Sequence, residues 1–298
     1  MKKLTQTQMG EILIFMEVFL WSLFPVVTTM AFANSAISAI FASAISTLIA
    51  AVFFAVILTI QKRWSDFKVV SAWKDILIMT LLIGIGFYGL IFIGIEKTSA
   101  SEAGIIMLME IFFSLLLLHF LKKELLTKKV AVGAILMLVG AILVLYNGEF
   151  GVNPGNLIIL LATMIAPMGN YYSQQARTKV SSSFIMFVRS LISGIFLLAM
   201  AFAFGKTSSI GEVNSALIYL VINGIFLLGL TKIFWIEAIH RIPITKAISF
   251  SAMAPVFTII FAYFLLEDVP TFLQICGFVP VIFGAMILTE FNFRKVAA

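Results

Sequence analysis

The sequence predicts an all-α integral membrane protein with ten transmembrane helices, arranged as two inverted five-helix repeats with both termini in the cytoplasm. The composition is the first observation behind this prediction: 62% of the 298 residues are hydrophobic and 11% are charged, against about 45–50% and about 25% in soluble domains. The chain also divides into ten apolar runs, and its second part resembles its first. So few polar side chains cannot coat a water-facing surface of this size, which excludes a soluble fold.

The ten runs are identified from their length and from the residues that separate them. A spanning helix needs about 20 mostly apolar residues, and Gly, Asn, Pro, Ser and charged residues separate runs of that size. The connections between runs are short, so no extramembrane domain is expected. The runs fall near 10–31, 36–60, 75–95, 102–121, 129–146, 155–176, 183–204, 215–239, 246–266 and 271–291.

The first run also resembles a cleavable secretory signal. Lys2 and Lys3 precede an apolar stretch that ends in the small-residue pattern AFA at 31–33. The stretch is longer than the roughly 7–15 residues of a signal core, and Glu17 lies near its middle. We therefore expect an uncleaved first helix of a bundle.

The basic residues predict the orientation. With the N-terminus inside, sixteen of the 20 Lys and Arg fall in cytoplasmic connections, whereas Lys97 and Lys206 lie outside and Arg189 and Lys232 lie within runs. The positive-inside rule then puts both termini in the cytoplasm, the connection 148–155 outside, and the protein in the cytoplasmic (inner) membrane. The sixteen are Lys2, Lys3, Lys62, Arg63, Lys68, Lys74, Lys122, Lys123, Lys128, Lys129, Arg177, Lys179, Arg241, Lys246, Arg294 and Lys295.

An internal repeat supports the even number of runs. The predicted repeats are 1–147 and 154–293, and five runs in each give them opposite orientations in the membrane. Inverted repeats recur in secondary transporters, because two half-structures rocking about a midplane site give inward-open and outward-open states of similar energy. A shift of 144 residues aligns Ala103, Met109, Thr127, Gly133, Gly140 and Ala141 with Ala247, Met253, Thr271, Gly277, Gly284 and Ala285, and a shift of 145 aligns Gly10 with Gly155.

Paired motifs at the same spacing carry a family resemblance. The segments 91–103 (IFIGIEKTSASEA) and 236–247 (IEAIHRIPITKA) are each followed by a helix and a spaced pair of glycines, and Trp21-Ser22 stands in the first run. In these features the chain resembles EamA-type transporters of the drug/metabolite transporter superfamily. The resemblance implies ten helices and movement of a small molecule, with a cavity lined by the first, third, fourth, sixth, eighth and ninth helices. The later residues of the motifs are Glu124, Thr127, Gly133 and Gly140, then Pro255, Glu267, Asp268, Thr271, Gln274, Gly277 and Gly284.

Glu110 is the most informative buried charge. It lies near the middle of the fourth run, where an ionised group costs at least about 2.5–3.5 kcal/mol on insertion scales. At helical spacing it shares a face with Met107 and Ser114, and the corresponding face of the ninth run carries Ser251 and, in place of the acid, Ala254. These faces suit a water-accessible cavity, with Glu110 as a substrate or proton site. A structural acid bonded to a neighbouring helix is the alternative.

Two further charges lie inside runs. Glu17 shares a face with Trp21, which fits either a cavity wall or a helix-packing face. Lys232 occupies the repeat position of Tyr88, and Trp235 follows one turn later. An unpaired lysine at this depth is unfavourable, so it should pair with Glu17 or Glu110, bind a substrate carboxylate, or titrate.

The sixth run adds Asn170, Tyr171 and Gln174 just after Pro167. They could line the cavity or form a structural polar zipper between helices. Four other polar residues lie close enough to the cytoplasmic ends to reach the interface, and we expect them to be anchors. They are Arg189, Glu237, His240 and Lys246.

The sequence lacks the residue patterns that several classes of functional site require. The single Cys276 and the two histidines, His119 and His240, are poor material for a metal site, and no HExxH, P-loop or Gly-x-Ser-x-Gly pattern occurs. The GxGxxG pattern at 84–89 lies inside an apolar run, where its glycines favour close packing or bending instead of nucleotide binding. We expect no catalytic residue, metal, cofactor or nucleic acid.

The sequence therefore predicts a secondary transporter of a small amphipathic metabolite, such as an amino acid or a related compound, moved outward by alternating access. It leaves coupling to protons open. A passive channel or facilitator is the alternative, although a channel typically carries a ring of like residues. The expected partners are the solute and membrane lipid, in a monomer or homodimer.

Overall fold

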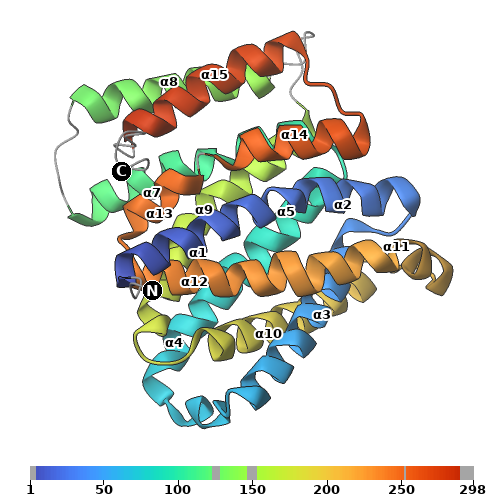
Figure 1. The fold of residues 1–298 in the computed structure, drawn as a ribbon. Coiled ribbons are helices and arrows are strands. Elements are labelled where there is room, and N and C mark those ends of the chain that lie inside the picture. Colours follow the sequence, from blue (N-terminus) through green and yellow to red (C-terminus); the bar gives the residue numbers. More distant parts are fainter. Residues whose placement is uncertain (1–4, 123–127, 146–152, 252, 289–298) are drawn as a thin grey trace.

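The computed structural model describes residues 5–122, 128–145, 153–251 and 253–288, and helices fill most of these ranges, with no strand among them (Figure 1). A helix occupies each of the ten predicted runs. The helices are α1 (Gln6–Trp21), α2 (Leu23–Asn34), α3 (Ala39–Ile60), η1 (Trp64–Lys68), α4 (Val70–Met79), η2 (Thr80–Phe87), α5 (Tyr88–Ile95), α6 (Ala100–Met107), α7 (Met109–Lys122), α8 (Lys128–Leu145), α9 (Pro154–Arg177), α10 (Ser182–Ala203), α11 (Ile210–Ile222), η3 (Asn223–Leu230), α12 (Thr231–Arg241), α13 (Ile244–Ser251), α14 (Ala254–Leu266) and α15 (Phe272–Leu288).

Short polar side chains begin several of these helices. Thr5, Ser38, Ser181 and Ser209 precede α1, α3, α10 and α11, and each accepts a hydrogen bond from the backbone N–H three residues later. This contact satisfies a backbone donor that has no partner within the helix. The polar residues between apolar runs therefore fix where the helices start.

Five of the described helical runs are long and apolar enough, by length and composition, to cross a membrane. Two shorter helices, α14 and most of α15, are also apolar. In Figure 1 the helices run mostly from left to right, and α1 begins on the side where α15 ends. The five long runs are Gln6–Asn34, Ala39–Ile60, Val70–Ile95, Ser182–Ala203 and Ile210–Arg241.

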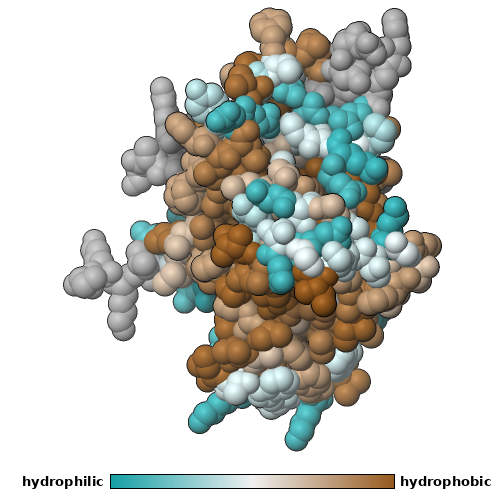
Figure 2. Space-filling model, turned by 90° about the vertical axis from the view of Figure 1, so that its right-hand side faces the viewer, coloured by the Kyte–Doolittle hydropathy of each residue, from teal (hydrophilic) through white to brown (hydrophobic). Residues whose placement is uncertain are grey.

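Large apolar side chains cover the flanks of the bundle. Along α3, Val52, Val56 and Ile60 are exposed by 66%, 53% and 74% at a spacing of one helical turn. Viewed from the right-hand side of Figure 1, polar residues gather across the middle of the end face and hydrophobic residues lie around them (Figure 2). An apolar flank on an all-helical bundle is the surface that lipid requires, because helices satisfy their own backbone polar groups.

Two π-helical segments, η2 and η3, interrupt the third and eighth runs. A π-helix widens the turn, so the residues that follow face a different direction from that of a regular α-helix. Tyr88 follows η2 directly, and Lys232 is the second residue after η3. Gly84 lies within η2, where a Cβ atom would approach the Ser193 side chain of α10 to 2.8 Å. The glycines of this run thus allow close packing, as the sequence predicts.

Glycines also hold α8 and α15 together as an outer layer (Figure 1). A Cβ atom on Gly140 would lie 2.4 Å from the carbonyl oxygen of Gly277, and one on Gly284 would lie 2.6 Å from that of Gly133. Gly133 corresponds to Gly277 and Gly140 to Gly284 in the repeat, so the two contacts are related by a two-fold axis, as in a symmetric interface. Small residues at a helix crossing let the backbones approach closely.

Candidate substrate cavity

A cavity of about 100 Å³ lies in the middle of the bundle. Its walls come from the first, third, fourth, sixth, eighth and ninth runs, and also from α10 of the seventh run through Met186 and Arg189. Nine of the twelve candidate residues line it. They are Glu17, Trp21, Tyr88, Met107, Glu110, Asn170, Lys232, Trp235 and Ser251.

Three candidate residues lie outside the lining. Ser114 is buried one turn beyond Glu110, Tyr171 is 37% exposed, and the Gln174 amide donates to the carbonyl oxygen of Ile239 at 3.2 Å. The face of α9 that lines the cavity instead carries Ala166, Asn170 and Ser173, at spacings of four and three residues. The helix continues through Pro167, so Gln174 lies beside the lining face.

Lys232 pairs with Glu17 across the interface between α12 and α1. Its Nζ donates to Glu17 Oε1 at 2.9 Å, and the two side chains are only 12% and 3% exposed. The ammonium also lies 3.4 Å from the ring centroid of Trp21, close enough for a cation–π contact. Of the two acids that the sequence leaves open as partners for Lys232, Glu17 forms the ion pair. The contact with the Trp21 ring was not predicted.

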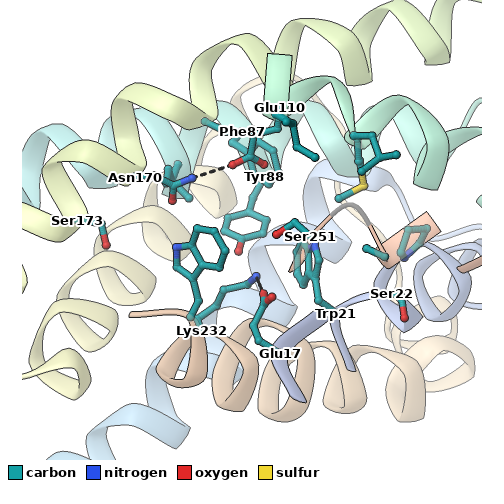
Figure 3. Close-up of a pocket in the computed structure, with 18 of the residues that line it drawn as sticks. Glu17, Trp21, Ser22, Phe87, Tyr88, Glu110, Asn170, Ser173, Lys232 and Ser251 are labelled. Atoms are coloured by element: carbon teal, nitrogen blue, oxygen red, sulfur yellow. Dashed lines mark hydrogen bonds and ion pairs between the residues drawn. The ribbon is translucent and has the colours of Figure 1, made fainter. Parts of the chain in front are cut away.

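Glu110 lies on the other side of the cavity, with Tyr88 between it and the Glu17–Lys232 pair (Figure 3). Asn170 Nδ2 donates to Glu110 Oε1 at 2.7 Å. Glu110 belongs to the first turn of α7, just after the break between α6 and α7 at Leu108. The acid therefore lies inside the bundle, directly after a helix break.

Arg189 corrects a prediction, because it is buried and does not reach the interface. The residue is 2% exposed, its Nη2 donates to Leu228 O at 3.4 Å, and its Cζ lies 5.2 Å from the Tyr88 ring centroid. Gly84 makes room for it, since a Cβ atom there would lie 3.2 Å from Arg189 Cγ. Depth along a helix can be read from a sequence, but the direction in which the side chain points depends on the neighbouring helices.

Aromatic rings form one wall of the cavity. Trp21 stacks on Phe24 with centroids 4.5 Å apart and planes at 9°, and Tyr88 meets both rings edge-on. The buried indole Nε1 of Trp235 has no hydrogen-bond partner in the described part of the chain. Phe24 and the Lys232 ammonium already contact the Trp21 ring, so the surface left for a small amphipathic molecule is the Trp235 indole with its free donor. The lining residues Pro25, Phe87 and Ser173 were not predicted from the sequence.

A polar network joins α6 to α9 and α15 at the right-hand end of the bundle in Figure 1. Glu102 accepts hydrogen bonds from Thr98 at 2.5 Å, from the Asn156 amide at 2.9 Å and from the Gln274 amide at 2.7 Å. Asp268 accepts one from the backbone N–H of Ser101 at 3.0 Å. Sequence reasoning missed Glu102, because an acid near a predicted helix start resembles a solvated terminal residue.

Ion pairs lie at the opposite end. Lys179 Nζ contacts Asp75 Oδ2 at 2.6 Å, Lys246 pairs with Glu11, and Glu237 contacts Arg177 at 2.9 Å. These ion pairs lie near one end of the bundle. That Glu237, His240 and Lys246 are anchors at the membrane interface stays a prediction. The cavity thus lies between two polar layers, each of which joins segments far apart in the sequence.

Comparisons with known proteins agree with this architecture. The model of the EamA-like transporter family matches residues 8–146 and again 153–290. The uncharacterized transporter YoaV of Bacillus subtilis is 22% identical over 228 residues, covering 75% of this chain and 78% of YoaV. An uncharacterized transporter of Methanothermobacter thermautotrophicus is 25% identical over 220 residues, covering 72% of this chain and 64% of its own. One solved crystal structure aligns over 96% of this chain and 97% of its own, with a TM-score of 0.71 at 18% identity.

Proposed function

Because this chain belongs to the EamA-like transporter family, we propose that it moves a small amphipathic metabolite across the cytoplasmic membrane by alternating access. Family membership makes it a membrane-embedded transporter of a small molecule. The finer proposal is that the solute is an amino acid or a related compound and that it moves outward. We refer below to residues 8–146 as the first half and to residues 153–290 as the second half.

The Glu17–Lys232 pair carries the proposal. It joins the first half to the second, and it is buried beside the cavity. Two charges in low dielectric hold each other strongly, yet a solute with its own charges can replace either partner. Solute binding can therefore change the contact between the halves, which is the differential interaction that a conformational change requires.

All ten helical runs span the membrane in this proposal, and the two halves are inverted with both termini inside. The distribution of Lys and Arg supports it, since sixteen of the 20 fall on one side. The ion pairs of Asp75, Glu11 and Glu237 lie on that same side, and the Glu102 network lies on the other.

Alternating access needs one end to open while the other stays closed. Contacts between the halves exist at both ends: Glu102 with Gln274 on the outer side, and Asp75 with Lys179 on the inner side. Polar contacts of this kind exchange readily with water, whereas a packed apolar core does not. We assign the two layers as the outer and inner gates.

Coupling to protons is assigned to Glu110. Its hydrogen-bond partner, the Asn170 amide, can donate to a carboxylate or accept from a carboxylic acid by turning over. Both protonation states can therefore be satisfied at this site, so the charge can change as the cavity faces each side of the membrane.

Counterflow in proteoliposomes tests the transport mechanism. Vesicles preloaded with unlabelled solute should transiently accumulate labelled solute, because a carrier exchanges one molecule for another. A passive channel lets label equilibrate without overshoot, and that result would overturn alternating access. Lys232→Ala should abolish counterflow while the protein remains inserted, and normal counterflow in that variant would remove the Glu17–Lys232 pair from the mechanism.

A further inference from the structure

Four charged side chains line the cavity, namely Glu17, Glu110, Arg189 and Lys232. Lys232 and Glu17 neutralise each other at 2.9 Å. Glu110 accepts from the neutral amide of Asn170. Arg189 is thus the cavity cation whose charge no carboxylate of the described residues balances within 4.0 Å.

The surroundings of Arg189 do not use its full donor capacity. A guanidinium has five N–H donors and keeps its charge in proteins. One nitrogen, Nη2, makes a long contact of 3.4 Å with Leu228 O, and Nε has no partner among the described residues. The Tyr88 ring lies 5.2 Å from Cζ, and the Tyr88 side chain also forms a hydrogen bond with the guanidinium. A neutral phenol satisfies a donor but does not balance the charge. A buried cation in this state favours an anion from outside the protein.

We propose that Arg189 binds a carboxylate of the transported solute, which makes the solute class an amphipathic carboxylic acid, including amino acids. A carboxylate matches the planar fork of a guanidinium with two parallel hydrogen bonds. The apolar part of the solute then lies against the ring of Trp235, which lines the same cavity. This inference rests on the proposed function, since it concerns the same cavity.

A structural role is the competing explanation, because the Leu228 carbonyl belongs to η3, where the α-helical hydrogen-bond pattern is interrupted. The two roles differ in what they predict for ligands. If Arg189 only supports η3, replacing it changes the binding of every ligand by the same factor. If Arg189 binds the solute carboxylate, replacing it reduces the preference for an acid over its amide.

Matched acids and amides separate these roles. The probes are phenylalanine with phenylalaninamide, leucine with leucinamide, and 3-phenylpropionate with 3-phenylpropionamide, each titrated against the purified full-length protein in a thermal-shift assay. The acid should bind about tenfold to a hundredfold more tightly than its amide, the range of a charge-assisted hydrogen bond. Arg189→Gln should abolish that ratio, and Arg189→Lys, which keeps the charge and loses the fork, should retain part of it.

Arg177→Gln is the matched control, because Arg177 pairs with Glu237 outside the cavity lining. It should leave the acid-to-amide ratio unchanged. Amides that bind wild-type protein as tightly as the acids, a full ratio in Arg189→Gln, or no stabilisation by any acid would each overturn the assignment. If Arg189→Gln does not fold, the wild-type ratio and Arg189→Lys still decide.

Counterflow distinguishes failure of this inference from failure of the proposed function. If phenylalaninamide or leucinamide shows overshoot and the acids do not, the protein is a carrier and Arg189 is not its carboxylate site. Absence of overshoot with every probe, together with channel-like equilibration, would overturn both.

Discussion

The two halves of the molecule share backbone features. Helices α6 and α13 coincide under a shift of 144 residues, and η2 and η3 lie 143 residues apart. The crossing of α8 and α15 uses Gly133 and Gly140 from one half and Gly277 and Gly284 from the other. Equivalent helix breaks and crossings give the halves similar mechanics, which two conformations of similar energy require.

The chemistry of the cavity is divided unequally. Both lining acids, Glu17 and Glu110, come from the first half, and both lining bases, Arg189 and Lys232, come from the second. Under the repeat shifts, alanines at 162 and 254 replace the two acids. In the proposed transport cycle, the shared backbone would support the motion, and the opposite charges would attract the halves and give the solute two different ends to recognise.

The strongest test of this comparison is the orientation of equivalent connections. Ser65 follows the second helical run of the first half, and Thr207 follows the corresponding run of the second half; both are exposed. If the halves are inverted, Cys at Thr207 should react fully with an impermeant thiol reagent on intact cells. Cys at Ser65 should react only after the membrane is permeabilised.

Both substitutions are made in Cys276→Ser, which removes the native thiol. Equal labelling of the two positions in intact cells would refute inversion. Labelling of Ser65→Cys alone would reverse the assignment of the inner side.

The next largest effect is expected for the pair that joins the halves. Glu17→Gln leaves Lys232 buried without a carboxylate, and we expect a loss of about 3–5 kcal/mol in unfolding free energy. The double variant Glu17→Gln/Lys232→Met removes both charges and should recover most of that stability while transport stays lost. Denaturant unfolding of the purified variants measures both effects.

Glu11→Gln is the control, because its Lys246 partner is 43% exposed. An exposed pair contributes at most about 1 kcal/mol. A similar loss in Glu11→Gln and Glu17→Gln would mean that burial does not strengthen the Glu17–Lys232 pair.

The sequence predicted those features that lipid and charge determine. Apolar runs of spanning length must be helical in a membrane, so all ten helical positions were correct. A charge at depth needs a partner or a function, so Glu17, Glu110 and Lys232 could be selected from position alone.

What the sequence could not provide is the direction of side chains around the helix axis. Arg189 was assigned to the interface from its depth, but packing of α10 against Gly84 turns it toward the cavity. The segments η2 and η3 depart from the period of 3.6 residues per turn. A helix face predicted from that period is therefore wrong for the residues beyond these segments. On α9 the sequence predicted Gln174 as a lining residue, but the neighbouring residue Ser173 lines the cavity.

The shared crossing predicts matched losses in the two halves. Gly140→Ala and Gly284→Ala each place a methyl group against the carbonyl oxygen of the facing helix. Each should cost about 1–3 kcal/mol, as overpacking does. Gly211→Ala, whose Cβ would meet its nearest atom at 3.9 Å, should stay within about 0.5 kcal/mol of wild type. A large loss in one variant alone would break the equivalence of α8 and α15.

The smallest effect on stability, and the most specific on function, is expected for Glu110→Gln. Glutamine keeps the size of the side chain and can bond to Asn170, so the fold and solute exchange should persist. The variant cannot release a proton, so the site stays neutral whichever side the cavity faces. Accumulation driven by a pH gradient should therefore disappear in proteoliposomes, and solute binding should show little dependence on pH.

Asn170→Ala is the companion variant, because it removes the amide that donates to Glu110 and leaves the carboxyl able to titrate. It should keep a pH dependence, displaced from that of wild type, whereas Glu110→Gln should have none. Gradient-driven uptake at the wild-type level in Glu110→Gln would exclude Glu110 as the coupling site. Glu17 would then be the remaining acid of the cavity lining, and its pairing with Lys232 would tie proton uptake to separation of the two halves.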